Sequence, residues 1–161
     1  MSEMFSHRPA LGPALGSGVT LTALPEGGHV VLLLTRAGAP APDVAGLRPA
    51  ELRPAGPGQW FVVGDGPADL AALRALPDVA VSDQSHGRVR IAVAGAQAAA
   101  MLAKGTAVDL DGLAVGASVT TLVGPLGVHL TRTGPAAFEL MVLRSFAAAL
   151  WHDLGAMAAE Y

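Results

Sequence analysis

The sequence predicts an α+β fold in which antiparallel sheets pack against helices. Short apolar segments with strand-like alternation recur along the chain, separated by turns rich in glycine and proline. Three other segments carry helical spacing or a helix-favouring composition. The two kinds of segment do not follow the repeated strand–helix–strand order of a doubly wound parallel sheet.

The 161 residues suit one domain, which we place at residues 19–161 after a loosely ordered lead-in over 1–18. A strand runs into a helix twice, at 60–76 and again at 138–154. The domain therefore contains either one continuous unit or two related halves, and both interpretations stay open.

Composition narrows the classes of function. Only 14% of residues are charged, against 52% hydrophobic, whereas about a quarter are charged in an average globular protein. Either an alanine-rich compositional bias or an apolar surface for partners explains this balance. A net charge of −3 lacks the basic footprint of a nucleic-acid-binding protein. With no cysteine, the chain has no disulfide, no thiolate metal ligand and no thiol nucleophile.

The same composition gives an expectation for location. No apolar run approaches the roughly 20 residues that a membrane span requires, and residues 1–12 lack the apolar core of a secretory signal. We therefore expect a cytoplasmic protein.

The first half of the domain reads as strands, one irregular segment and a short helix. Segments 19–24 and 29–35 resemble two strands of a hairpin around Pro-Glu-Gly-Gly at 25–28. Five prolines interrupt 37–58, which predicts a surface connection without regular structure. A strand over 59–64 then precedes a proline-initiated helix over 67–76.

The second half alternates strands with two further helices. We expect strands at 79–81 and 88–93 and an alanine-rich helix over 95–103, followed by strands at 119–123, 128–131 and 138–143. Ser145 is a plausible N-cap of the last helix. The apolar face of that helix recurs at spacings of four, four and three, at Phe146, Leu150, Leu154 and Met157.

Candidate catalytic groups are few and widely spaced. The histidines at 7, 29, 86, 129 and 152 lack the local spacing of a metal site. Asp109 and Asp111 flank one leucine, and Asp65 lies between two glycines, so turn roles are favoured over acid–base roles. The glycine-rich 12–18 segment lacks the Gly-Lys-Ser/Thr ending of a phosphate loop, and no serine has the nucleophile-elbow pattern.

Several stretches resemble the gamma subunit of heterotetrameric sarcosine oxidase. The strongest is Phe-Glu-Leu-Met-Val-Leu-Arg-Ser-Phe-Ala-Ala-Ala-Leu-Trp at 138–151, in register with Leu-Ala-Lys-Gly at 102–105. Supporting stretches are Gln-Trp-Phe-Val-Val-Gly at 59–64 and Val-Ser-Asp at 81–83. The chain departs from the family pattern at Thr106 and Ser118, where relatives often carry cysteine.

The resemblance implies an aminomethyltransferase-like, folate-binding type of module without a catalytic site of its own. The chain would be a non-catalytic subunit beside alpha, beta and delta subunits, in a complex that oxidatively demethylates sarcosine. It implies that FAD, FMN, NAD, zinc and tetrahydrofolate are held by the other subunits and none by this chain. Its sites would then be interface positions, for which we propose Trp60, Arg144, Phe146 and Trp151.

Local alternatives compete at these positions. For Trp60 and Phe146, packing in the core is favoured over a role in an interface, and for Trp151 the two roles are equally favoured. For Arg144, an exposed local ion pair is the simpler role. Two other functions also remain open. The chain is equally compatible with the corresponding subunit of an N-methylglutamate dehydrogenase, and less so with a free-standing folate-dependent aminomethyltransferase-like protein.

Overall fold

The computed structural model describes residues 11, 18–26, 28–47 and 50–161, which form two antiparallel sheets packed on each other. The larger sheet has the order β1-β6-β9-β8-β7 and the smaller one the order β3-β4-β2-β5. Every pairing between the named strands is antiparallel. This confirms the α+β class with antiparallel sheets. The predicted lead-in lies, except for Leu11 and Gly18, outside the described residues.

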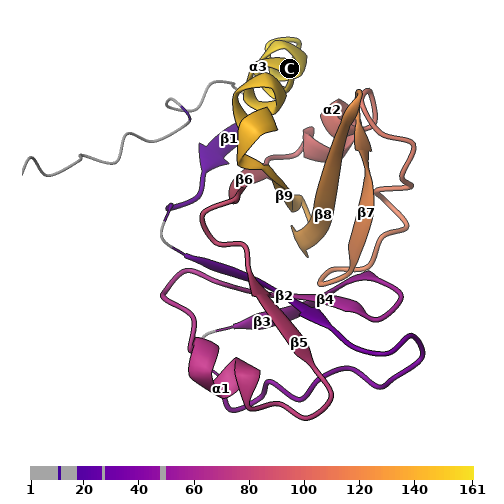
Figure 1. Cartoon of the computed structure of the whole chain (residues 1–161). Coiled ribbons are helices and arrows are strands. Elements are labelled where there is room, and N and C mark those ends of the chain that lie inside the picture. The colour runs from indigo at the N-terminus through magenta and orange to yellow at the C-terminus, as the bar shows by residue number, and fades with distance from the viewer. Residues whose placement is uncertain (1–10, 12–17, 27, 48–49) are drawn as a thin grey trace, which may run out of the picture.

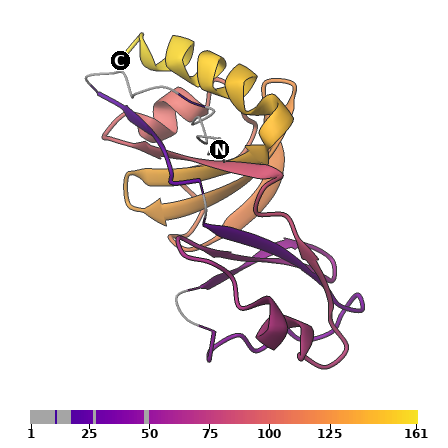
Figure 2. The same ribbon diagram turned by 60° about the vertical axis from the view of Figure 1, so that its left-hand side comes forward.

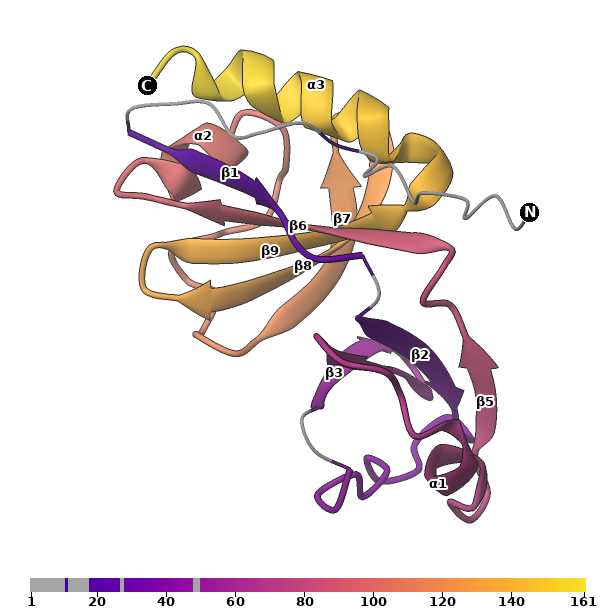
Figure 3. The same ribbon diagram turned by 90° about the vertical axis from the view of Figure 1, so that its left-hand side faces the viewer.

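The five-stranded sheet packs helices on one face and the smaller sheet on the other (Figures 1 and 3). Its strands are β1 (Thr20–Ala23), β6 (Arg88–Ala94), β9 (Ala137–Leu143), β8 (Leu126–Gly134) and β7 (Ser118–Val123). The covering helices are α2 (Ala98–Leu102) and α3 (Ala147–Ala158). The period-two alternation predicted for 88–93 is confirmed, since Val89, Ile91 and Val93 are all buried.

The main hydrophobic core lies between this sheet and its helices. Ile91, Leu130 and Leu140 from the strands meet Leu150 and Leu154 from α3, and all five side chains are fully buried. Each such side chain contributes about 1.5–3 kcal/mol of burial free energy. The core therefore fixes which sheet face is turned away from the helices.

The four-stranded sheet has its own smaller core under helix α1 (Leu70–Arg74). Its strands are β3 (Glu51–Gly56), β4 (Gln59–Gly64), β2 (His29–Leu34) and β5 (Ala80–Asp83). Val31, Leu33 and Val62 pack there with Leu73 of the helix. Asp69 caps the helix by accepting a hydrogen bond from the Ala72 backbone N–H at 2.9 Å.

The hairpin predicted for 19–24 and 29–35 is wrong, although both strands exist. Strand β1 pairs with β6 in the large sheet, whereas β2 pairs with β4 and β5 in the small one. The chain therefore passes from the larger sheet to the smaller one between Ala23 and His29. A second crossing follows β5 and leads into β6 (Figure 2).

The irregular connection predicted for 37–58 is wrong in its last third, which forms strand β3. Pro54 lies inside this strand, which is tolerated because β3 is the edge of its sheet and shifts register between Pro54 and Gly56. An edge strand has one unpaired side, so the missing N–H of proline costs no ladder bond there.

The last helix begins differently from the prediction. Arg144–Phe146 form a 3₁₀ turn, α3 starts at Ala147, and no side chain, including that of Ser145, caps it. Leu150 and Leu154 are buried as expected, but Phe146 remains 45% exposed. The 3₁₀ turn winds more tightly than the α-helix and takes Phe146 off the buried stripe.

Candidate functional site

The contact between the two sheets is built by strand alternation. In β9, Phe138, Leu140 and Val142 face the helices, so Glu139 and Met141 face the smaller sheet. Met141 is fully buried there, in a cluster with Val30, Phe61 and Val63. This small apolar cluster holds the sheets together beside a group of charged side chains.

A buried ion cluster is centred on Glu139. Its Oε1 accepts hydrogen bonds from Arg53 Nη1 of β3 at 2.7 Å and from Arg90 Nε of β6 at 3.0 Å. The side chains of Glu139 and Arg53 are each 6% exposed and that of Arg90 is 10% exposed. Because both arginines reach the same carboxylate, the cluster links the two sheets through charges shielded from water.

Two exposed carboxylates complete the cluster. Arg53 Nη2 donates to Glu51 Oε2 at 2.8 Å, and Arg90 Nη2 donates to Asp65 Oδ1 at 3.0 Å. Asp65 is therefore an ion-pair partner as well as a turn residue. Both outer carboxylates are largely exposed, so solvent weakens these two pairs relative to the central one.

The arginines set the protonation state of the central acid. Burial raises the pKa of Glu139, but the hydrogen bonds and positive charges of Arg53 and Arg90 outweigh it and hold the pKa below its ordinary value. Burial by itself would lower the pKa of Arg53, but the hydrogen bond and negative charge of Glu139 outweigh burial and raise that pKa. A carboxyl group that stays ionised does not act as a general acid near neutral pH.

The ion cluster lines a cleft of about 710 Å³ between the sheets. The wall also includes Leu24, Val44 and Thr133. Arg53 and Arg90 both bind Glu139 on its surface, which favours a structural contact between the sheets over a reaction centre.

His129 forms a second polar contact between the sheets. Its Nε2 donates to the Pro54 carbonyl oxygen at 2.9 Å, which leaves Nδ1 unprotonated and, within the described part of the chain, buried without a partner. The ring also meets Phe61 edge-on, with centroids 5.2 Å apart. Burial, assisted by the charges of Arg53 and Arg88, lowers the pKa of His129, so the ring is neutral at pH 7.

The four predicted interface residues do not form one group. Arg144 and Phe146 share the 3₁₀ turn and Trp151 follows on α3, whereas Trp60 lies on β4 of the other sheet. Arg144 Nη1 donates to Glu26 Oε2 at 2.8 Å, an ion pair within the chain that joins residues 118 positions apart. Trp60 and Trp151 are each half-buried against the core of their own layer.

The ion cluster was missed by sequence reasoning. Glu139 is the one charged residue within the apolar run 138–143, and a charge at such a position is unusual unless it is paired. That signal marks Glu139 as a buried group. Nothing local identifies its partners, because Arg53 is 86 residues away along the chain.

Other positions singled out from the sequence have local roles. Asp109 Oδ1 accepts from the Gly112 N–H at 3.0 Å, as expected for a turn, and Arg132 Nη1 anchors that turn through the Leu113 carbonyl at 2.7 Å. The Ser118 hydroxyl lies 2.8 Å from Thr131 Oγ1, and the Thr106 hydroxyl lies 3.2 Å from Thr121 Oγ1. Small hydrogen-bonded hydroxyls fit these places.

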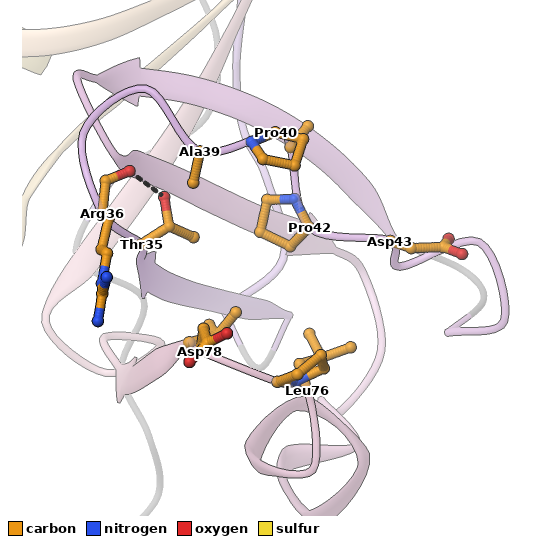
Figure 4. Close-up of a pocket in the computed structure, with 11 residues that line it drawn as sticks. Thr35, Arg36, Ala39, Pro40, Pro42, Asp43, Leu76 and Asp78 are labelled. Atoms are coloured by element: carbon orange, nitrogen blue, oxygen red, sulfur yellow. Dashed lines mark hydrogen bonds between the residues drawn. The ribbon is translucent and has the colours of Figure 1, made fainter.

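A second hollow of about 430 Å³ lies at the far end of the smaller sheet. Figure 4 shows Pro40, Pro42 and Asp43 on one side and Leu76 and Asp78 on the other. Its walls are mostly proline, alanine, leucine and valine side chains. Over the described residues, no three histidine, aspartate or glutamate side chains are grouped as metal ligands, and no helix is long and apolar enough to cross a membrane.

Comparisons with known proteins agree with this architecture. A heterotetrameric sarcosine oxidase from Corynebacterium sp. U-96, solved in complex with pyrrole 2-carboxylate, contains a chain with the same fold. The two chains superpose with a TM-score of 0.76 at 21% identity, over 88% of this chain and 84% of that one. Comparison with curated proteins finds no significant match. The model of the family described as "Sarcosine oxidase, gamma subunit family" matches residues 51–160, and the chain belongs to that family.

Proposed function

We propose that this chain is the non-catalytic gamma subunit of a heterotetrameric sarcosine oxidase, assembled with alpha, beta and delta subunits. The observation that carries the proposal is the family match over residues 51–160, which spans both the ion cluster and the terminal helix. The complex would oxidatively demethylate sarcosine and link that reaction to tetrahydrofolate in the cytoplasm. The likeness to an aminomethyltransferase module belongs to the same proposal.

The chemistry of the sheet interface supports a structural role. Its central carboxylate is held ionised by two arginines, and each of those arginines also binds an outer carboxylate. Groups that saturate one another in this way stabilise a joint and offer no free acid or base. The same proposal has FAD, FMN, NAD, zinc and tetrahydrofolate held by the other subunits.

Co-expression tests the proposal directly. The tagged chain, produced together with alpha, beta and delta subunits of the same organism, is expected to co-purify with all three in equal amounts. The complex is expected to oxidise sarcosine, and the isolated chain is expected to oxidise neither sarcosine nor N-methylglutamate.

The outcomes separate the competing functions. Oxidation of N-methylglutamate in preference to sarcosine by the complex would assign the chain to an N-methylglutamate dehydrogenase. Tight calorimetric binding of tetrahydrofolate to the isolated chain, without co-purification, would instead indicate a free-standing folate-dependent protein.

A further inference from the structure

We propose that the end of the large sheet around Leu122, Leu143 and Arg88 docks a partner subunit through a segment in which a carboxylate is flanked by apolar side chains. The inference rests on the proposed function, because it assigns the surface at which this chain enters the complex. It is carried by register, by exposure and by an arginine that pairs with no carboxylate among the described residues.

The register places these residues in one row across the sheet. Leu122 pairs with Gly127, and Leu143 pairs with Arg88. Val128 pairs with Val142, so the next step of the ladder brings Gly127 opposite Leu143. Directly opposed residues point to the same face, so the row is continuous over β7, β8, β9 and β6, the strands marked in Figure 3.

The row is apolar and open. Leu122 is 57% exposed and Leu143 is 44% exposed. Between them Gly127 has no side chain, and a Cβ added there would meet no atom within 4 Å. Because neighbouring strands are about 4.8 Å apart, the two leucine positions lie roughly 10 Å apart on either side of Gly127, a spacing that suits one side chain of a partner.

Arg88 supplies the charge at the end of this row. Its Nε donates to Gln84 Oε1 at 2.6 Å, and its guanidinium lies 4.7 Å from the centroid of the Phe61 ring. Arg53, Arg90 and Arg144 each bind a carboxylate, whereas no described carboxylate pairs with Arg88. Burial accordingly lowers the pKa of Arg88 with nothing to oppose it.

A half-buried guanidinium beside exposed leucines defines the chemistry of the occupant. Covering the leucines removes more water from Arg88, and this is favourable only when the partner supplies an anionic acceptor. The planar guanidinium is already packed on an aromatic ring, and a guanidinium of this kind is suited to bind a carboxylate through two parallel hydrogen bonds. The occupant is therefore apolar with an aspartate or glutamate next to the inserted side chain.

The absence of cysteine from the chain permits a direct test of coverage. Leu143→Cys is compared with Leu34→Cys, a leucine of similar exposure at 41% on the smaller sheet. Each variant is alkylated free and in the complete complex, and modification of this chain is followed by mass spectrometry. We expect alkylation at position 143 to slow at least tenfold in the complex, and that at position 34 to keep its rate.

Affinity provides the second measurement. Leu122→Ser and Leu143→Ser should each weaken assembly about tenfold or more, as expected for loss of a buried leucine contact. Arg88→Glu should weaken it further, whereas Arg36→Glu, at an exposed arginine in the loop that follows β2, should not. The melting temperature of each isolated variant shows whether it still folds.

The outcomes distinguish this inference from the proposed function. If the wild-type chain assembles while position 143 is alkylated equally fast free and in the complex, the docking surface is overturned and the subunit assignment stands. Failure of the wild-type chain to assemble overturns both. Protection of position 143, with weakened assembly of the folded serine variants, supports the surface.

Discussion

Glu139 shows how a single residue joins the two layers of this fold. Strand alternation turns it away from the helical core, and burial alone would leave it a protonated, poorly solvated acid. Two arginines from different sheets keep it ionised instead. The joint therefore depends on charge balance among groups that are each unfavourable alone.

Removing this one charge should weaken the whole domain. Glu139→Gln leaves Arg53 and Arg90 buried with only exposed carboxylates as partners, so we expect the free energy of unfolding to fall by about 3–5 kcal/mol. Urea denaturation of the isolated chain measures the change. Asp65→Asn is the matched control, because its side chain is 75% exposed and its pair should contribute less than about 1 kcal/mol. Equal losses in the two variants would contradict the central role of Glu139.

His129 should make the stability of the folded chain depend on pH below about 6.5. The pKa of His129 in the folded chain lies below its ordinary value of 6.5. Below pH 6.5, His129 therefore binds a proton in the unfolded chain while it stays neutral in the folded chain. Stability should therefore fall as the pH drops from about 6.5 towards the folded pKa, by up to about 1.4 kcal/mol per pH unit.

The variant His129→Gln isolates this effect. The glutamine amide is able to donate to the Pro54 carbonyl but does not titrate, so the slope of stability between pH 6.5 and 5 should flatten. His152→Gln, on the exposed side of α3, should leave the slope unchanged. Urea unfolding at half-unit steps of pH measures both, and an unchanged slope in the His129 variant would refute this origin.

At the scale of elements, the buried apolar face of the last helix begins within α3 and not at the 3₁₀ turn before it. Leu154 is fully buried in the main core, whereas Phe146 lies on the 3₁₀ turn before the helix and is 45% exposed. Leu154→Ala should lower the free energy of unfolding by about 2–5 kcal/mol. Phe146→Ala should lower it by less than about 1 kcal/mol although it removes a larger side chain. Chemical denaturation of the two variants measures both losses, and a larger loss in the Phe146 variant would show that Phe146 belongs to the core.

Elements were more predictable than their pairing. The alternation at 88–93 and the apolar runs at 59–64 and 138–143 give strands in the expected places, because burial of one or both faces leaves a local pattern. The Pro-Glu-Gly-Gly segment signals a change of direction but not which sheet receives the next strand. Strand β3 was missed because Pro54 argues against a strand, and only its edge position makes the proline acceptable.

The candidate site was likewise predictable from the sequence only where its signal is local. An acid inside an apolar strand is visible in the sequence, whereas its arginine partners become neighbours only when the two sheets pack. The row of Leu122, Leu143 and Arg88 likewise exists only through register across four strands. Local composition is unable to encode such long-range neighbours.

At the scale of the whole molecule, the crossing from β1 to β2 ties the layers together. Gly28 lies in this crossing, and a Cβ placed there would stand 2.5 Å from the Gly64 carbonyl oxygen and 3.3 Å from Arg90 Nη1. The first neighbour is backbone of β4, so the clash is not relieved by rotating a side chain. The second belongs to the ion cluster, so movement here disturbs the charge balance at the joint.

We therefore expect Gly28→Ala to destabilise the chain by about 1–3 kcal/mol, the usual cost of overpacking a close contact. Gly46→Ala is the control, since a Cβ at Gly46 meets nothing within 4 Å. If the crossing and the ion cluster act as one unit, the losses in Gly28→Ala and Glu139→Gln should not add, because the first already displaces the arginine that the second leaves unpaired. Urea denaturation of the two single variants and the double variant measures this coupling. Additive losses would show that the layers are held by independent contacts.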